Sequence, residues 1–447
     1  MRSSKFGQKI IYYQIKNLKN HSNQLSNLIK KTGYKKFSPS GITSYLSFRY
    51  PIGDLTMFDE YKKIPCGSEI KNGELMTYWY PLFNNKKNSL EMACKKLETL
   101  LIKSIILPTK EKRVAIPLSG GLDSSLLLGL YKKIYPNKKV YTYSAGFYGD
   151  DEFEYSALVA KKFASVHKEK ILYKEDYIGK NSLLKPLIRQ KGEPLHPNEI
   201  ALAAIEQMAK KDGCDLVICG EGSDDIFGGY GQNFRMYINY KKDKPFFKFF
   251  LKNYRYFSIK DRQKIIKKEY LVDDYKLLNS FLNKKEIPSN IKNKAFYFIQ
   301  KIHTPGLIIR GSNAMRFNNF NPVFPYLNPK LVEFVNSLPF EYKVHWKSKE
   351  HEKKSKNMHF RKVSEKMDIP KYILKKLAEK YLPHKIIYRP KYGFPVPFQK
   401  WFSKLKTWPL NKEIFKTNDI SSFNGWKKFM IINLNTFINE FKKYKND

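Results

Sequence analysis

The sequence has few cysteines, no long apolar run and few acidic residues for its length. Its four cysteines are scattered without CxxC spacing, at Cys66, Cys94, Cys214 and Cys219. That pattern argues against a zinc site and against a disulfide framework, and it suits a reducing compartment. No stretch approaches the roughly 20 apolar residues of a membrane span, and the N-terminus lacks the apolar segment of a signal peptide. We therefore expect a cytoplasmic protein without a membrane span.

The shortage of acidic residues leaves a large positive charge. Lys and Arg number 83 against 41 Asp and Glu, which gives a net charge of +42. An excess of this kind can mark a nucleic-acid partner or an anionic membrane surface. Here the lysines are spread through most of the 447 residues, with local clusters at 241–248, 343–356 and 442–445. We favour lysine-rich solvated surfaces over a dedicated nucleic-acid site, which stays the less favoured alternative.

The first quarter of the chain shows only weak patterns. Residues 1–37 are polar and lysine-rich, with weak helical periodicity between Ile10 and Ile29, and we interpret them as a basic N-terminal extension. Residues 38–110 are interpreted as a linker-like segment. It contains a short helix, two strands around the Asn72-Gly73 turn and a helix over residues 89–107.

Residues 111–235 alternate between apolar runs and helical patterns. Strands are predicted at 114–118, 140–147, 169–173 and 215–219, and helices at 122–135, 154–166 and 199–213. This alternation predicts an α/β fold with a doubly wound parallel sheet. Residues 236–447 form a mainly helical C-terminal part, with helices expected at 246–254, 330–338, 361–367 and 371–382.

The clearest motif directly follows the first predicted strand of that sheet. It consists of Ser119, Gly120, Gly121, Leu122, Asp123, Ser124 and Ser125, and it opens a helix. The glycines let the backbone approach an oxyanion, and the helix N-terminus supplies free N–H groups. Asp123 would repel a bare phosphate, so it suggests a carboxylate that holds Mg²⁺ against phosphates. The lysine of a Walker A loop is missing.

A second loop, from Cys219 to Tyr230, follows another strand and carries Glu221, Asp224 and Asp225 among four glycines. Such an acidic cluster is costly unless a cation compensates it. Both loops come at the carboxyl ends of strands, where ligands bind in open α/β sheets. We expect Asp123 and Asp224 to face each other across one crevice.

These two segments resemble the synthetase domain of the asparagine synthetase family, whose relatives include β-lactam synthetases and lasso-peptide cyclases. The resemblance covers roughly residues 38–402. It includes residues 43–67 with Tyr78-Trp79, which are similar to the segment joining the family's two domains, and residues 371–402, which are similar to its C-terminal signature. The resemblance implies a sheet of the ATP pyrophosphatase (adenine nucleotide alpha hydrolase-like) type. It also implies an ATP-dependent carbon–nitrogen ligase that forms an acyl adenylate and releases AMP and pyrophosphate.

The resemblance also implies residue roles. Residues 119–125 would bind pyrophosphate, Asp123 and Asp224 would hold Mg²⁺, and Tyr230 would close the site. Glu221 would assist attack by the amine, and Lys371 would stabilise charge on the α-phosphate, as a fixed ammonium can. The adenosine pocket would be lined by Leu118, Ala145, Cys219 and Gly220. Arg389 and Lys391 belong to the same signature and are weaker candidates.

The sequence departs from the family in two places. Glutamine-dependent members begin with a cysteine nucleophile after Met1, whereas Arg2 stands here, so we expect no glutaminase activity in this chain. Nitrogen would come as ammonia, from a separate glutaminase subunit or from another amine. The family's ExRxPFLD segment is replaced by FNNFNPVFPYLN, which keeps Pro325, Tyr326 and Leu327 but loses the charged side chains. A lost arginine removes a bidentate partner for a carboxylate, which puts aspartate in doubt as the substrate.

Three enzymatic functions remain open, whereas the intact loops at 119–125 and 219–230 disfavour a non-enzymatic role as a degenerate scaffold subunit. The first is an asparagine synthetase-like ligase acting on a small carboxylate, with aspartate as the default substrate. The second is the same chemistry on a sugar acid or a peptide. The third is an RNA-modifying enzyme with an ATP pyrophosphatase loop, which the basic charge favours and the loop at 219–230 disfavours.

Overall fold

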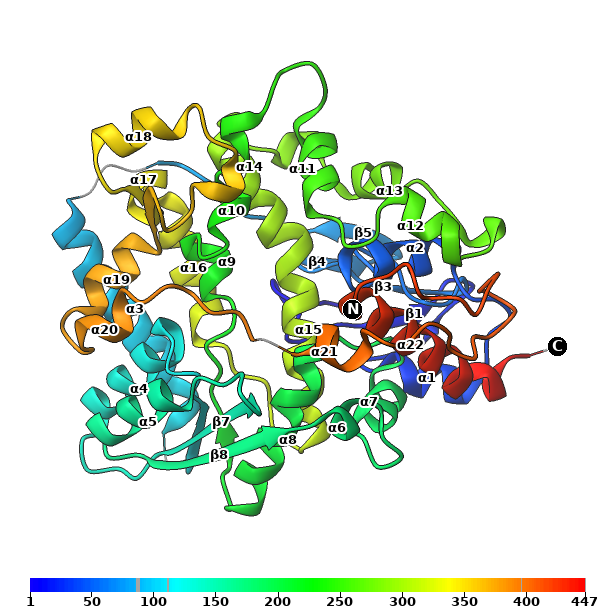
Figure 1. Cartoon of the computed structure of the whole chain (residues 1–447), viewed down its shortest axis with the longest axis horizontal. Coiled ribbons are helices and arrows are strands. Elements are labelled where there is room, and N and C mark those ends of the chain that lie inside the picture. The colour runs from blue at the N-terminus through cyan, green and yellow to red at the C-terminus, as the bar shows by residue number, and fades with distance from the viewer. Residues whose placement is uncertain (86–88, 111, 395, 447) are drawn as a thin grey trace.

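The computed structural model describes residues 1–85, 89–110, 112–394 and 396–446 (Figure 1). Residue 111, the predicted start of the α/β core, and residue 395, within the C-terminal signature, lie outside the described residues. The other predicted boundaries, after residues 37, 110 and 235, stay predictions.

A four-stranded parallel sheet forms the α/β core. Its strands are β6 (Val114–Pro117), β7 (Tyr141–Phe147), β8 (Val166–Leu172) and β9 (Leu216–Val217), in the order β8-β7-β6-β9. The predicted strands are all found, although β8 begins three residues earlier and β9 is only two residues long. Most of β6 and β7 is buried, as expected for strands that are covered on both faces.

Helices cover both faces of this sheet. The chain steps from β6 through α4 (Leu122–Ile134) to β7, and through α5 (Phe153–Lys162) to β8. It then reverses direction through α6 (Lys174–Ile178), α7 (Leu184–Lys191) and α8 (Pro197–Lys211) to reach β9 beyond β6. Because such crossovers are right-handed, α8 lies on the face opposite α4 and α5. The sheet is therefore doubly wound, and its direction switches between β6 and β9.

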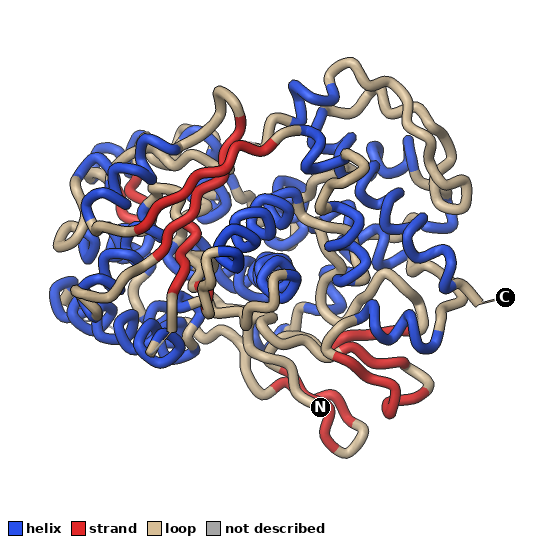
Figure 2. Tube along the Cα trace, turned by 90° about the horizontal axis from the view of Figure 1, so that it is seen from below, coloured by secondary structure: helices blue, strands red, loops and turns tan. Residues whose placement is uncertain are grey.

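Residues 1–37 form strands and a helix that pack into the molecule. β1 (Tyr12–Gln14), β2 (Asn17–Ser22) and β3 (Tyr61–Lys63) make an antiparallel sheet. Figure 2 shows the short antiparallel strands apart from the long strands of the parallel sheet. Only α1 (Leu25–Thr32) is helical in this segment. The weak helical periodicity that starts at Ile10 therefore wrongly indicates a helix over the residues up to Ser22, which form β1 and β2. The reason is tertiary: β1 pairs with β3, about 50 residues later, and that pairing overrides a weak local pattern.

The segment 38–110 contains the predicted elements. They are α2 (Pro39–Phe48), a hairpin of β4 (Ser68–Lys71) and β5 (Glu74–Thr77), and α3 (Leu90–Thr109). Asn72 and Gly73 both have positive φ, at 51° and 84°, as a type I′ turn requires. The predicted Asn-Gly turn is therefore confirmed.

The rest of the chain is mainly helical, as predicted. Two exceptions are a small sheet of β10 (Val344–Trp346) with β11 (Asp368–Pro370), and residues 361–367, where the predicted helix is wrong. There a short 3₁₀ turn gives way to Glu365 at φ 64°, which a continuing α-helix does not allow. The helices are α9 (Ser223–Phe227), α10 (Gly231–Phe234), α11 (Phe246–Tyr254), α12 (Ile259–Ile265), α13 (Asp274–Phe281), α14 (Ile291–Phe298), α15 (Thr304–Phe317), α16 (Pro329–Ser337), α17 (Phe340–Lys343), α18 (Lys349–Ser355), α19 (Tyr372–Ala378), α20 (His384–Ile387), α21 (Phe398–Phe402) and α22 (Gly425–Phe441).

Two hydrophobic cores hold these parts together. One surrounds the parallel sheet and takes in α3, α16 and α19. The other joins the N-terminal sheet to α22 and the aromatic helices α11 and α14. Figure 1 shows α15 running through the middle of the molecule, with α1 and α22 together near the C-terminus. Within the described part of the chain, no helix is long and apolar enough to cross a membrane.

Candidate active site

The first loop of the site connects β6 to α4. Gly120 has a φ of 67°, and a Cβ there would lie 2.5 Å from the backbone nitrogen of Ser156, so only glycine fits. The Gly121 N–H donates to Ser119 Oγ at 3.2 Å, and the Ser119 N–H donates to Ser124 Oγ at the same distance. The serines thus shape a loop of backbone donors at the start of a helix, which suits a polyanion.

The second loop follows β9 and touches the first. A Cβ on Gly220 would lie 3.3 Å from the Ser124 nitrogen, so the two loops are in contact. Across this contact, Ser223 Oγ donates to Asp123 Oδ1 at 2.8 Å. The expected meeting of the two loops at the switch point of the sheet is therefore what the structure shows.

Lys371 bridges the carboxylates of the two loops. Its Nζ lies 2.6 Å from Asp123 Oδ2 and 2.6 Å from Asp224 Oδ1, and the residue is only 6% exposed. Lys371 follows β11 with a left-handed φ of 56°, a strained conformation that aims its side chain at the loops. A Cβ on Gly229 would lie 2.2 Å from Lys371 Cε, so glycine there makes room for the lysine.

The charges of this cluster stabilise one another. Burial alone would raise the pKa of Asp224, but Lys371 and Lys391 outweigh it and hold that pKa well below its usual value. Burial alone would lower the pKa of Lys371, but Asp123 and Asp224 together raise it. Asp224 and Lys371 are thus expected to be ionised at neutral pH. Asp225 differs, because burial raises its pKa to about 7.

The C-terminal signature supplies two further cations. Lys391 Nζ lies 2.7 Å from Asp224 Oδ2 and 4.9 Å from the ring centre of Tyr230. Arg389 forms an ion pair with Glu152 and reaches the Ser119 carbonyl oxygen at 3.5 Å. Both residues therefore stand beside the two loops, which strengthens candidates that the sequence supported weakly.

Glu221 has a partner that the sequence did not indicate. Arg310, on α15, approaches Glu221 Oε1 through Nη2 at 2.7 Å and through Nε at 3.3 Å. The two side chains are only 14% and 12% exposed. Glu221 Oε2 is buried and has no hydrogen-bond partner among the described residues, so only one of the two carboxylate oxygens is held by the protein.

The proposed adenosine-lining residues lie at the ends of three neighbouring strands. Leu118 follows β6 and its N–H donates to the Tyr143 carbonyl at 2.8 Å, Ala145 is in β7, and Cys219 follows β9. Leu118 and Cys219 are buried and Ala145 is half-buried. Tyr230 donates to Asp225 Oδ2 at 3.4 Å and packs edge-on against His303. The structure gathers these residues around one edge of the sheet.

Asp123 and Asp224 are the two residues of this site that could hold a metal ion together with substrate phosphates. Within the described residues, no group of three or more His, Cys, Asp or Glu side chains is placed to hold a metal ion. Asp123 and Asp224 converge on one point from two loops. Mg²⁺ is commonly held by one or two carboxylates together with substrate phosphates, and this pair is a donor set of that kind.

Comparisons with known proteins show the family of the chain. Residues 97–430 match the family model for asparagine synthase. The glutamine-hydrolyzing asparagine synthetase 1 of Bacillus subtilis (strain 168) is 21% identical over 453 residues, covering 91% of this chain and 67% of that protein. A putative glutamine-hydrolyzing asparagine synthetase 1 of Methanocaldococcus jannaschii is 25% identical over 321 residues.

These relatives are longer than the present chain. The match to the M. jannaschii protein covers 68% of this chain and only 50% of that protein. Among solved structures, the U34-tRNA thiolase NcsA from Methanococcus maripaludis matches 32% of this chain and 50% of its own at 17% identity, with a TM-score of 0.24. That score is too low to bear on function.

Proposed function

The chain belongs to the asparagine synthase family, and on that premise we propose that it is an ATP-dependent ligase that adenylates a carboxylate and amidates it. The observation that carries this proposal is the bridge from Asp123 through Lys371 to Asp224, which joins the two loops at the switch point of the sheet. Carboxylates and a fixed ammonium at that place suit the cleavage of ATP between its α and β phosphates.

The residues divide the work as follows. The loop at 119–125 binds the pyrophosphate leaving group through backbone N–H groups and serine hydroxyls. Asp123 and Asp224 would hold Mg²⁺, which neutralises phosphate charge when bound. Lys371 then meets the charge that develops on the α-phosphate. Leu118, Ala145, Cys219 and Gly220 line the adenosine site, and Tyr230 closes it.

Glu221 acts after the adenylate has formed. Its Oε1 is held by Arg310, and its buried Oε2 accepts a proton from the attacking amine. Aspartate is the default carboxylate because curated relatives are asparagine synthetases. Ammonia, a separate glutaminase subunit or another amine supplies the nitrogen. A cytoplasmic location stays a prediction from the cysteine pattern.

Exchange of labelled pyrophosphate into ATP tests the proposal. We expect exchange that needs Mg²⁺ and a carboxylate, with aspartate first in a panel of acids. Asp123→Asn and Asp224→Asn should abolish exchange while the circular dichroism spectrum stays that of the wild type. Glu221→Gln should keep part of the exchange but make little amide, since an amide side chain cannot take up the proton.

Two results would contradict the proposal. Release of ADP and phosphate in place of AMP and pyrophosphate would exclude adenylation. Strict dependence of ATP turnover on added tRNA, with binding that falls steeply as salt rises, would favour the RNA-modifying alternative.

A further inference from the structure

A cavity of about 220 Å³ opens at the carboxyl ends of β7 and β8. Most of its lining is apolar or aromatic and comes from Phe147, Tyr148, Leu172, Tyr173, Pro397 and Trp401. Within the described residues, neither the loop at 119–125 nor the loop at 219–230 contributes to the lining, so the cavity is separate from the candidate active site. Open α/β sheets bind their ligands at this edge, and the cavity therefore lies where a ligand is expected.

Two tyrosines at the cavity are exposed to solvent. Tyr148 directly follows β7 and is 79% exposed, and Tyr173 directly follows β8 and is 54% exposed. Phe147 and Leu172 are partners in the parallel ladder, so the two tyrosines come at the same level of neighbouring strands. Single exposed apolar residues need no explanation, whereas aromatic rings gathered at a hollow are typical of a ligand site.

The inner wall of the cavity is firmly packed. Trp401 lies edge-on to Phe147 with ring centres 5.6 Å apart, and Phe394 packs on the same phenylalanine at 5.2 Å. Phe398, on the same short helix α21 as Trp401, stacks on Phe429 of α22 at 4.3 Å. The indole ring is therefore held in place by its neighbours, as a largely preformed ligand pocket requires.

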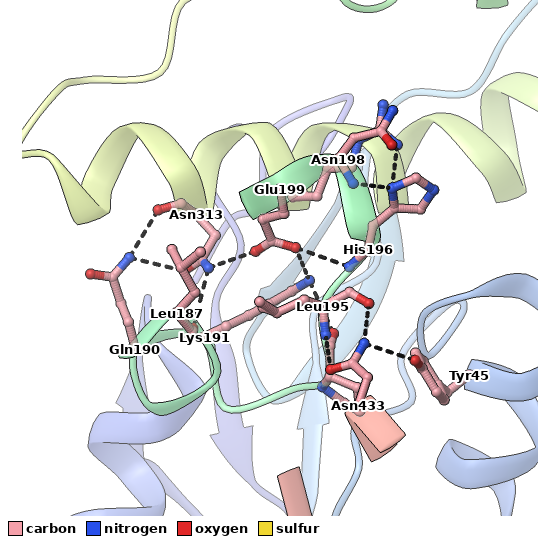
Figure 3. A network of polar contacts seen from close by, with 12 residues as sticks. Tyr45, Leu187, Gln190, Lys191, Leu195, His196, Asn198, Glu199, Asn313 and Asn433 are labelled. Carbon is pink, nitrogen blue, oxygen red and sulfur yellow. Dashed lines mark hydrogen bonds and ion pairs between the residues drawn. The ribbon is translucent and has the colours of Figure 1, made fainter. Parts of the chain in front are cut away.

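The helix behind this wall, α22, is anchored to the turn before α8 (Figure 3). Asn433 on α22 accepts from the Leu195 N–H at 3.1 Å and donates to the Leu195 carbonyl oxygen at 2.6 Å. In the same turn, Glu199 accepts from Lys191 Nζ at 3.1 Å and from the His196 N–H at 3.2 Å. Figure 3 shows Asn433 and Leu195 beside this network. Through α22, the wall of the cavity is thus tied to a helix that covers the parallel sheet.

The charged residues of the lining are of both signs. They are Lys174, Glu175 and Lys400. Within the described residues none of the three forms an ion pair, and Lys174 Nζ lies over the Phe402 ring at 5.7 Å. Glu175 would repel an anion, and the two lysines would repel a cation. A neutral ring with several hydroxyl groups suits this lining, because each hydroxyl can donate to the carboxylate and accept from an ammonium.

We propose that this cavity binds the pyranose ring of a carbohydrate. The C–H groups on one face of such a ring are apolar and pack on the aromatic rings of Tyr148, Tyr173 and Trp401. The hydroxyl groups at its edge bond to the charged side chains of the lining. The proposal goes beyond the proposed function, which requires no second site. It also gives sugar acids a place beside aspartate in the panel of acids that tests the ligase.

Binding of the methyl α-pyranosides of glucose, galactose and mannose to the full chain tests this, with calorimetry and saturation-transfer NMR as the measurements. At least one of the three should bind, and its ring C–H protons should receive more saturation than its methyl group. Tyr148→Ala and Tyr173→Ala should each weaken binding by about threefold or more, because each removes a stacking ring. Tyr148→Phe keeps the ring and should bind nearly as the wild type does. Leu107→Ala is the matched control, since Leu107 is 81% exposed near the end of α3, which leads to the amino end of β6 at the opposite edge of the sheet.

Several results would overturn the carbohydrate site. They are no binding of any of the three pyranosides, binding that both alanine variants leave unchanged, and displacement of the sugar by saturating ATP, which would make the cavity part of the nucleotide site. Uridine that binds through Tyr148 where no sugar does would assign the cavity to a nucleobase instead. Melting temperatures show that each variant is folded. None of these measurements uses pyrophosphate exchange, so the carbohydrate site and the ligase proposal can each fail while the other stands.

Discussion

Replacing Lys371 by methionine should expose the repulsion that this lysine now neutralises. Its Nζ lies 2.6 Å from an oxygen of Asp123 and 2.6 Å from an oxygen of Asp224. The two oxygens are therefore at most about 5 Å apart, because each of them lies 2.6 Å from the same nitrogen atom. Methionine keeps the length of the side chain and removes the charge. The strain at φ 56° is common to both residues and does not change.

The size of the effect follows from this geometry. Two unit charges about 5 Å apart repel by about 3 kcal/mol at an effective dielectric constant of about 20. Removing one partner from a buried ion pair costs roughly 3–5 kcal/mol in measured cases. Lys391 still compensates Asp224 at 2.7 Å, so we expect the lower end of that range. The entropy of unfolding is about 2.1 cal/mol/K per residue. For a chain of 447 residues, each kcal/mol of lost stability therefore lowers the melting temperature by about 1 °C.

Thermal unfolding at low salt measures this. Lys371→Met should melt roughly 3 °C below the wild type. The double variant Lys371→Met/Asp224→Asn should recover most of the loss, because one of the two repelling charges is gone. Lys376→Met is the matched control on the same helix, since its ion pair with Glu379 is exposed and should contribute below about 1 kcal/mol. If the two substitutions destabilise additively, or if Lys371→Met melts like the control, the bridge is not the stabilising element described above.

Two further predictions concern groups outside this bridge. The purified chain should release no glutamate from glutamine, because none of its cysteines is a reactive thiolate. Burial raises the pKa of the Cys66 thiol to about 12, and the other three cysteines are buried. Glutamate formation that the substitution Cys66→Ala abolishes would contradict this prediction. Lys343 is fully buried without a hydrogen-bond partner among the described residues, and burial lowers its pKa to about 7. The unfolded chain keeps that proton to about pH 10.4, so between pH 7 and 10 the unfolded state binds more protons and the free energy of unfolding rises with pH. Lys343→Met should therefore stabilise the protein by roughly 2–4 kcal/mol at pH 6 and by clearly less at pH 9 in urea unfolding, and an equal effect at both pH values would show that Lys343 is not titrating.

The parallel core could be predicted because its signals are local and strong. β6 and β7 are continuous apolar runs, and each is followed by a helix with clear periodicity. The start of β8 was missed because His167 and Lys168 lie on the edge strand of the sheet, where polar residues hide the pattern. β1 was missed for the opposite reason, since its partner strand is far away in the sequence and nothing local indicates it.

The two loops of the site could be predicted for a similar reason. Glycine and acidic residues right after a buried strand have few structural explanations, and the order of strands puts the loops together. The arginine partners could not be found. Positions 49, 196, 221 and 310 share no spacing, and only the packing of α2, α8 and α15 brings their side chains into contact. In a chain with 83 Lys and Arg, no local pattern marks Arg310 as the partner of Glu221, although Arg310 opens a run that resembles the family.

The altered ExRxPFLD segment can now be explained in physical terms. Two of the three residues it keeps support the two loops: Tyr326 donates to the Asp123 carbonyl oxygen at 2.9 Å, and Leu327 Cγ lies 2.5 Å from where a Cβ on Gly222 would be. Asn328 accepts from the Lys330 N–H at 3.1 Å and caps α16, which an aspartate would do equally well. The loss of the charged side chains of this segment therefore leaves both loops supported. A guanidinium still reaches the site, from Arg310 on Glu221. The loss of one arginine thus does not leave the site without a guanidinium, and by itself it does not argue against a carboxylate substrate.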